Sequence, residues 1–134
     1  VVDDYAHHPS ELEATLSAAR QAFPGRRLVA VFQPHLYSRT AEHGQAMGRA
    51  LAAADLVIVT EVYAAREQPI PGVSGRQVAE AATGAGADAS FEPARAEVGK
   101  HVFAALRPGD VVLTLGAGDI TRVGAELVRS LDAA

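Results

Sequence analysis

The feature of this sequence that most constrains its fold is the alternation, five times along the chain, of short β-branched runs with segments of helical spacing. Several runs are apolar throughout and lack the two-residue alternation of a strand with one solvent-exposed face. We therefore expect strands that are buried on both faces. Such strands occur in parallel sheets between layers of helices. The sequence therefore predicts an α/β fold, a three-layer, Rossmann-like, doubly wound and mostly parallel sheet flanked by helices.

The boundaries of these elements follow from turn residues and from the apolar stripes of the helices. The first helix is expected to begin near Pro9, with Ser10 and Glu13 forming a capping box. The predicted strands cover residues 1–4, 28–32, 56–60, 87–91 and 111–115. The later helices are predicted after Tyr37 and over residues 76–83, 94–106 and 119–131.

Length and composition favour a single domain, residues 1–134, because a chain of this size buries roughly two-thirds of its unfolded surface in one core. A net charge of −4 and one lysine, Lys100, disfavour nucleic acid and anionic membranes as partners. Cysteine is absent, no apolar run approaches the ~20 residues of a membrane span, and no signal peptide is visible, so we expect a cytoplasmic protein. The chain opens on Val1 rather than methionine, and we expect it to be a piece of a longer protein.

Polar chemistry follows four of the five predicted strands. The segments are DDYAHHP at residues 3–9, FQPHLYSRT at 32–40, EVYAAREQPIPGVSG at 61–75 and GAGDIT at 116–121. In a doubly wound sheet, ligands bind beyond the carboxyl ends of the strands, on the loops that lead into helices. We therefore expect all four segments on one rim, with the ligand site there.

Two kinds of chemistry are disfavoured by spacing. A metal site at His7 and His8, beside Asp3 and Asp4, is disfavoured because adjacent side chains diverge, whereas metal-binding histidines share a face. A serine hydrolase would need a G-x-S-x-G turn after a strand, and GVSG at 72–75 lacks that spacing. No metal ligand is assigned on this basis.

Two interpretations of these polar residues remain open: they bind a ligand through polar contacts, or they only stabilise the fold. Aspartate can accept from ribose hydroxyls or an ammonium group, imidazole can donate to an oxyanion, and Arg39 can form a fork with a carboxylate. Alternatively, these residues only cap helices, as Asp119 would in the GAGDIT turn. No G-x-x-x-x-G-K-[ST] segment occurs, so the chain has no phosphate-cradling loop of its own.

Taken together, the four segments, in this order and spacing, resemble the C-terminal domain of the Mur ligase family over essentially the whole chain. The phrase FQPHLYSRT resembles the L-alanine-adding branch rather than the paralogue that recycles murein peptides. The resemblance implies a three-domain parent enzyme of peptidoglycan synthesis that uses ATP and Mg²⁺ to join L-alanine to UDP-N-acetylmuramate. It further implies that a central ATPase domain carries the P-loop and most contacts to Mg²⁺, so that the isolated chain is inactive.

The resemblance also implies residue roles. Tyr5, His7 and Arg39 match positions that line the L-alanine site, with Arg39 placed for the carboxylate. Asp4 and His8 match nucleotide-side positions, facing ribose and phosphates. The geometric expectation is that Tyr5, His7, Arg39 and Asp119 converge along one lip, as half of a pocket.

Further roles implied by the resemblance fall on the later loops. His35, with His7, would lie beside the reacting groups, and Glu67 and Asp119 are secondary substrate-binding candidates. Leu36 stands where many members of the family have a second arginine, so the carboxylate clamp is reduced to Arg39 unless Arg66 substitutes. The family also implies one antiparallel strand in the sheet.

Two alternatives of other classes remain at this point. The chain could be a self-contained small-ligand or nucleotide-binding regulatory domain of Rossmann-like type, which would bind its ligand unaided. It could also be a free-standing histidine-dependent hydrolase, which would turn over substrate and lose that activity on His7→Ala. Ligand binding by the isolated chain distinguishes these alternatives from a ligase domain.

Overall fold

Five parallel strands form one sheet in the computed structural model, which describes residues 1–133. The strand order is β1-β5-β2-β3-β4, so β5 inserts between β1 and β2. The strands are β1 (Val2–Asp4), β2 (Leu28–Phe32), β3 (Leu56–Thr60), β4 (Asp88–Glu92) and β5 (Val111–Leu115). The helices are α1 (Pro9–Ala22), α2 (Tyr37–Leu51), α3 (Gly75–Gly84), α4 (Arg95–Ala105) and α5 (Thr121–Ala133).

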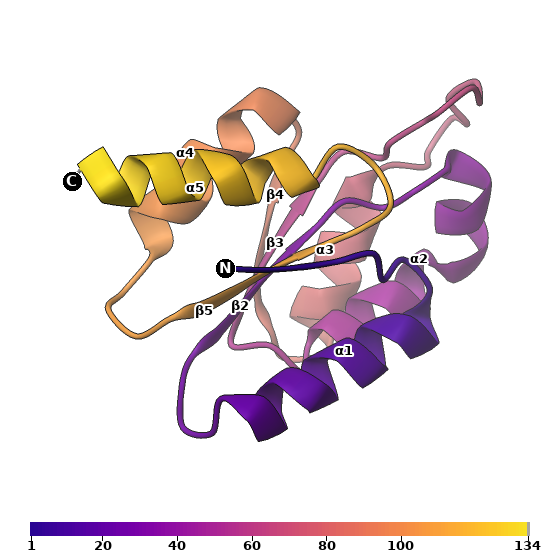
Figure 1. The fold of residues 1–134 in the computed structure, drawn as a ribbon. Coiled ribbons are helices and arrows are strands. Elements are labelled where there is room, and N and C mark those ends of the chain that lie inside the picture. Colours follow the sequence, from indigo (N-terminus) through magenta and orange to yellow (C-terminus); the bar gives the residue numbers. More distant parts are fainter. Residues whose placement is uncertain (134) are drawn as a thin grey trace.

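Helices cover both faces of the sheet (Figure 1). Apolar side chains of α1, α2 and α3 pack in one cluster on the first face, and those of α4 and α5 pack in a second cluster on the other. Every residue of β2, β3 and β5 is buried, as the uninterrupted apolar runs predict. The three-layer α/β prediction is confirmed, whereas the antiparallel strand is wrong for residues 1–133, where all strand pairs are parallel.

The first helix begins two residues earlier than the predicted capping box requires. Pro9 is the first helical residue, so His8 is the N-cap and Glu11, rather than Glu13, is the third helical residue. The Nδ1 atom of His8 accepts from the backbone N–H of Ser10 at 3.4 Å, and Glu11 accepts from the N–H of His8 at 3.0 Å. The predicted capping box of Ser10 and Glu13 is wrong, because the helix begins at Pro9 and the imidazole of His8 takes the N-cap role.

Strand order and register bring four loops together. Leu115, at the end of β5, is paired with Asp4 of β1 on one side and with Phe32 of β2 on the other. Phe32 is paired in turn with Val59, next to the last residue of β3. The four strands that precede polar segments are therefore neighbours with level ends, and β4, whose following loop is generic, lies at the sheet edge.

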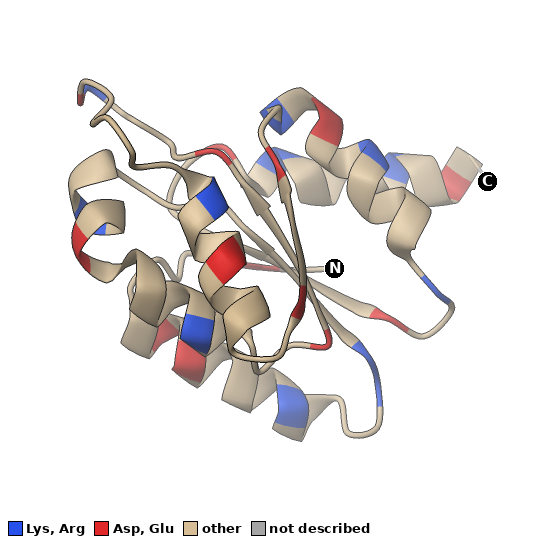
Figure 2. Ribbon diagram, turned by 180° about the vertical axis from the view of Figure 1, so that it is seen from behind, with Lys and Arg blue, Asp and Glu red and all other residues tan. Residues whose placement is uncertain are grey.

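The opposite end of the sheet is held by ion pairs. Arg27 contacts Asp110 at 2.7 Å, and Arg20 contacts Asp55 at 2.9 Å. Charges of both signs are interspersed over the elements (Figure 2). Within residues 1–133, no helix is both long and apolar enough to cross a bilayer.

Helices α2 and α3 approach each other unusually closely at Gly48. A Cβ atom on Gly48 would lie 2.5 Å from the Cβ of Ala81 and 2.6 Å from the carbonyl oxygen of Val78. Only glycine permits this separation of the two helix backbones. The close contact fixes the position of α2, whose first turn carries part of the candidate site.

Candidate functional site on the strand-end rim

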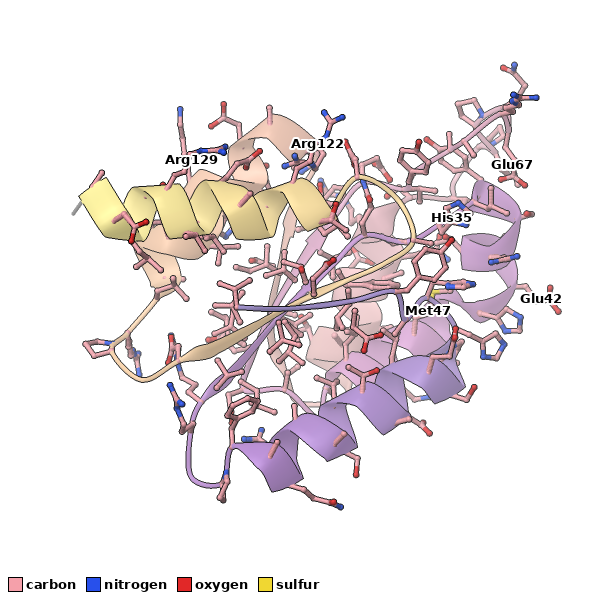
Figure 3. All side chains as sticks on the ribbon, in the orientation of Figure 1. His35, Glu42, Met47, Glu67, Arg122 and Arg129 are labelled. Atoms are coloured by element: carbon pink, nitrogen blue, oxygen red, sulfur yellow. The ribbon has the colours of Figure 1, made fainter. Side chains whose placement is uncertain are left out.

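Four aromatic rings form a row across the rim, and they come from the loops after β1, β2 and β3. The ring centres of Tyr5 and His7 lie 5.6 Å apart, and those of His7 and His35 lie 6.0 Å apart. Tyr63 stacks on His35, with ring centres 5.8 Å apart and planes inclined by 14°. We call Tyr5, His7, His35 and Tyr63 the aromatic row. Figure 3 shows His35 and Glu67 at the same end of the molecule.

His7 has a defined tautomer when it is neutral. Its Nδ1 atom lies 3.1 Å from the carbonyl oxygen of Tyr5, and a carbonyl can only accept, so Nδ1 carries the proton. The Nε2 atom of the neutral ring is then a proton acceptor. Glu11 lies 3.6 Å from the same ring and forms an ion pair with it when His7 is protonated. Tyr5, whose residue surface is 69% exposed, leaves this side of the row open to a ligand.

The surroundings of His35 favour its neutral imidazole form. Burial lowers its pKa below the ordinary value, and the nearby charges of Arg39 and His7 lower it further, against an opposing effect of Glu67. Its Nδ1 atom is buried without a hydrogen-bond partner among the described residues. Since the unfolded chain binds this proton more tightly, acidification below about 6.5 destabilises the fold through His35.

The pKa of His35 reports whether the charge of Arg39 lies near the aromatic row. We expect Arg39→Ala to raise the pKa of His35 towards its ordinary value, because the substitution removes a positive neighbour of the ring. Arg49→Ala is the matched control, since Arg49 is an exposed arginine in the last turn of the same helix. Titration of the imidazole carbon-bound protons by NMR measures both variants. Equal titration curves for His35 in the two would place Arg39 away from the rim.

The long loop between β3 and α3 is fastened to the start of α2. Glu67 accepts from the backbone N–H of Ser38 at 3.1 Å and from the Ser38 hydroxyl. That hydroxyl contact lowers the pKa of the Glu67 carboxyl and keeps it ionised. The predicted substrate-binding residue Glu67 therefore lies close to Arg39 and His35, with its carboxylate engaged by Ser38.

Backbone contacts join the loops after β2 and β3. The N–H of Leu36 donates to the carbonyl of Tyr63 at 2.9 Å, and the N–H of Tyr63 donates to Pro34 at 2.8 Å. Leu36 has a φ of 70°, a left-handed backbone angle that is uncommon for leucine. His35 lies in this turn between β2 and α2, with its ring between those of His7 and Tyr63. Residues in uncommon backbone conformations, such as Leu36, occur often at functional sites.

The turn after β5 completes the rim on the side of Tyr63. Gly118 packs against that ring, since a Cβ atom on Gly118 would lie 2.6 Å from the Cγ of Tyr63. Asp119, predicted as a substrate ligand, accepts from the side-chain amide of Gln33 at 2.7 Å. Its other carboxylate oxygen lies 3.5 Å from the guanidinium of Arg95.

The two predicted nucleotide-side residues have local structural roles. The carboxylate of Asp4 accepts from the N–H of Ala6 at 2.9 Å, which shapes the turn after β1. His8 caps α1, and its ring lies 5.1 Å from that of His43 on α2. In residues 1–133, no three histidine, aspartate or glutamate side chains gather in a geometry that could hold a metal ion.

Sequence reasoning missed two residues of the rim, Tyr63 and Gln33. Both stand inside the quoted polar segments, but no spacing rule distinguishes a ring that stacks on His35 from an exposed tyrosine. Gln33 directly follows β2 and is 3% exposed, so its burial was the missing information. The polar segments identified the correct loops without identifying these contacts.

These features define a Rossmann-like α/β domain that presents imidazole and tyrosine side chains at the carboxyl ends of neighbouring parallel strands. Residues 1–118 match the family model described as Mur ligase, glutamate ligase domain. The chain belongs to the Mur ligase family.

Two relatives of similar sequence share the name UDP-N-acetylmuramate–L-alanine ligase. The chain is 51% identical over 133 residues to the UDP-N-acetylmuramate–L-alanine ligase of Cutibacterium acnes, covering 98% of this chain and 28% of that protein. It is 52% identical over 134 residues to the Mycobacterium tuberculosis ligase of the same name, covering 98% and 26%. The chain thus spans little more than a quarter of the length of these relatives.

Solved structures agree on the fold. A crystal structure of the UDP-N-acetylmuramate–alanine ligase from Thermotoga maritima superposes with a TM-score of 0.80 at 29% identity, covering 97% of this chain and 26% of that one. A murein peptide ligase from Psychrobacter arcticus superposes with a TM-score of 0.75 at 21% identity, covering 96% and 26%. The latter likeness concerns the fold alone.

Proposed function

We propose that this chain is the substrate-closing C-terminal domain of an ATP-dependent ligase that joins L-alanine to UDP-N-acetylmuramate in peptidoglycan synthesis. The observation that carries the proposal is the aromatic row, which assembles Tyr5, His7 and His35 beside the charge of Arg39. Family membership and the names of the 51% and 52% identical relatives support the same reaction.

The chemistry needs groups that this rim supplies. L-Alanine arrives as an ammonium carboxylate, and its nitrogen must lose a proton before it can attack the carbon of an acyl phosphate. The C–N bond then forms, the C–O bond to phosphate breaks with its electron pair, and the nitrogen loses a second proton. We assign proton acceptance to His35 and to the Nε2 atom of His7, and binding of the amino-acid carboxylate to Arg39; the Nδ1 contact of His7 and the charge of Arg39 near His35 support this assignment.

The remaining assignments concern the nucleotide and the second face of the site. Asp4 and His8 lie next to the row and are proposed to face ATP, while Glu67 fixes the loop that borders the amino-acid pocket. No residue of this chain is assigned as a Mg²⁺ ligand, and the central domain is proposed to hold most contacts to that ion. The open row needs a second surface, supplied by the central ATPase domain, which would exclude water from the acyl phosphate.

An experiment with the full-length protein and the isolated chain tests this function. We expect the full-length protein to release phosphate only when ATP, UDP-N-acetylmuramate and L-alanine are all present. The isolated chain should show no turnover and no measurable calorimetric binding of ATP or L-alanine, because half of the pocket is missing. Micromolar binding by the isolated chain would instead support a self-contained regulatory domain, and turnover lost on His7→Ala would support a hydrolase.

A further inference from the structure

We propose that Gln33 is a positioning residue, whose side-chain amide fixes the turn after β5 and through it the stacked pair of Tyr63 and His35. The inference rests on the proposed function, because its kinetic test uses that reaction. Gln33 is 3% exposed and directly follows β2, two residues before His35. Its position lets one side chain contact the turn that leads into α5.

The amide of Gln33 has only one orientation that satisfies its partners. Its Nε2 atom donates to the Oδ1 atom of Asp119 at 2.7 Å, and its Oε1 atom accepts from the backbone N–H of Ile120 at 3.1 Å. Rotating the amide by half a turn would place oxygen against carboxylate and N–H against N–H. In addition, the backbone N–H of Gln33 donates to Leu115 at 3.0 Å. Gln33 therefore joins β2 to both ends of the turn.

The turn transmits its position to the row through direct contact. A Cβ atom on Gly118 would lie 2.5 Å from the Oε1 atom of Gln33 and 2.6 Å from the Cγ of Tyr63. The Gln33 amide and the tyrosine ring thus both lie close to Gly118, where a side chain would not fit. Because Tyr63 stacks on His35, a displaced turn displaces the imidazole that faces the substrate.

This assignment gives Asp119 a different part from direct substrate binding. One of its carboxylate oxygens contacts Gln33, and the other faces Arg95, whose Nη2 atom donates to Glu126 at 3.1 Å. Asp119 then serves as the hydrogen-bond acceptor through which Gln33 fixes the turn. The hydrogen bond itself, rather than the negative charge of Asp119, is what the site requires.

Matched glutamine substitutions in the full-length protein test the role of Gln33. Gln77 is the control, since its amide also makes two hydrogen bonds, to Thr40 and from Ser74, between α2 and α3. We expect Gln33→Met to lower kcat/KM for L-alanine about tenfold, because misplacing a reacting group by a fraction of an ångström slows the reaction strongly. Gln77→Met should lower the melting temperature similarly and leave kcat/KM for L-alanine unchanged. Equal kinetic effects would overturn the proposal.

A charge exchange separates positioning from direct substrate contact. Gln33→Glu alone places two carboxylates against each other and should lower kcat/KM for L-alanine at least as much as Gln33→Met. Adding Asp119→Asn restores the hydrogen bond in reverse, with the new amide at position 119 donating to the new carboxylate at position 33. The double variant should recover most of the lost activity. If Asp119 contacts the substrate itself, Asp119→Asn is damaging alone and rescues nothing, and the proposal is then wrong.

Hydrogen exchange provides a readout that does not depend on the proposed reaction. Gln33→Met should accelerate amide exchange in the segment that contains Ile120, whereas Gln77→Met should not. A wild-type protein without L-alanine-dependent phosphate release would refute the proposed function, and faster exchange at Ile120 would still support the positioning role. Unchanged exchange in Gln33→Met would refute that role whatever the reaction.

Discussion

Arg39→Ala in the full-length protein is expected to raise the KM for L-alanine about ten- to a hundredfold, with little change in the KM for ATP. The physical reason is the fork of two hydrogen bonds that a guanidinium forms with a carboxylate, a charge-assisted contact of about 1.5 to 3 kcal/mol once water is excluded. Leu36 stands where the family resemblance implies a second arginine, so the first turn of α2 supplies this charge from Arg39. Initial-rate kinetics with each substrate varied in turn measures the effect.

Two further variants sharpen the test of Arg39. Arg39→Lys keeps the charge but loses the planar fork, so its KM for L-alanine should fall between those of the wild type and the alanine variant. Arg49→Ala, on the same helix, should leave every KM unchanged. A parallel rise in the KM for ATP and for L-alanine would show that Arg39 acts on domain closure rather than on the amino acid.

Gly48→Ala is expected to lower the free energy of unfolding by about 3 kcal/mol, an unusual cost for adding one methyl group. The new Cβ would meet the Cβ of Ala81 at 2.5 Å, the carbonyl oxygen of Val78 at 2.6 Å and the backbone nitrogen of Ala82 at 2.8 Å. Two of these atoms belong to the backbone of α3 and cannot rotate away. Urea unfolding of the isolated chain, followed by circular dichroism, measures the change.

The control for Gly48 is another helical glycine with free space. Gly84 is the last residue of α3, and a Cβ atom there would meet nothing within 4 Å. Gly84→Ala should therefore raise the free energy of unfolding by up to ~1 kcal/mol through helix propensity alone. Comparable destabilisation by both substitutions would mean that α2 and α3 are not in close contact at Gly48.

The strands were predictable because their sequence signal is local. Uninterrupted apolar runs bounded by turn residues gave residues 28–32, 56–60 and 111–115, and the structure has β2, β3 and β5 with these bounds. The start of the last helix was harder to predict, since the glycines of GAGDIT do not mark a helix boundary. The prediction was Asp119, whereas α5 begins at Thr121. Local patterns thus sufficed for the α/β class and for the loops that carry polar chemistry.

The details of the site depend on contacts between distant segments, which no local pattern contains. The insertion of β5 between β1 and β2 makes Gln33 a neighbour of Asp119, although they are far apart in sequence. The cap of α1 depends on an imidazole acting as acceptor, a role for which serine is the usual choice. The roles assigned to Tyr5, His7 and Arg39 come from the family resemblance and remain predictions.

The place of β1 at the edge of the sheet has a consequence for the rim. Within residues 1–133, β1 pairs with β5 alone, yet Tyr5 and His7 follow it directly. The placement of those two rings beside His35 therefore depends on one strand ladder, whereas β2 and β5 are each paired on both sides. Substitutions along that ladder are therefore expected to alter the rim without touching the buried pairing of β2 with β3.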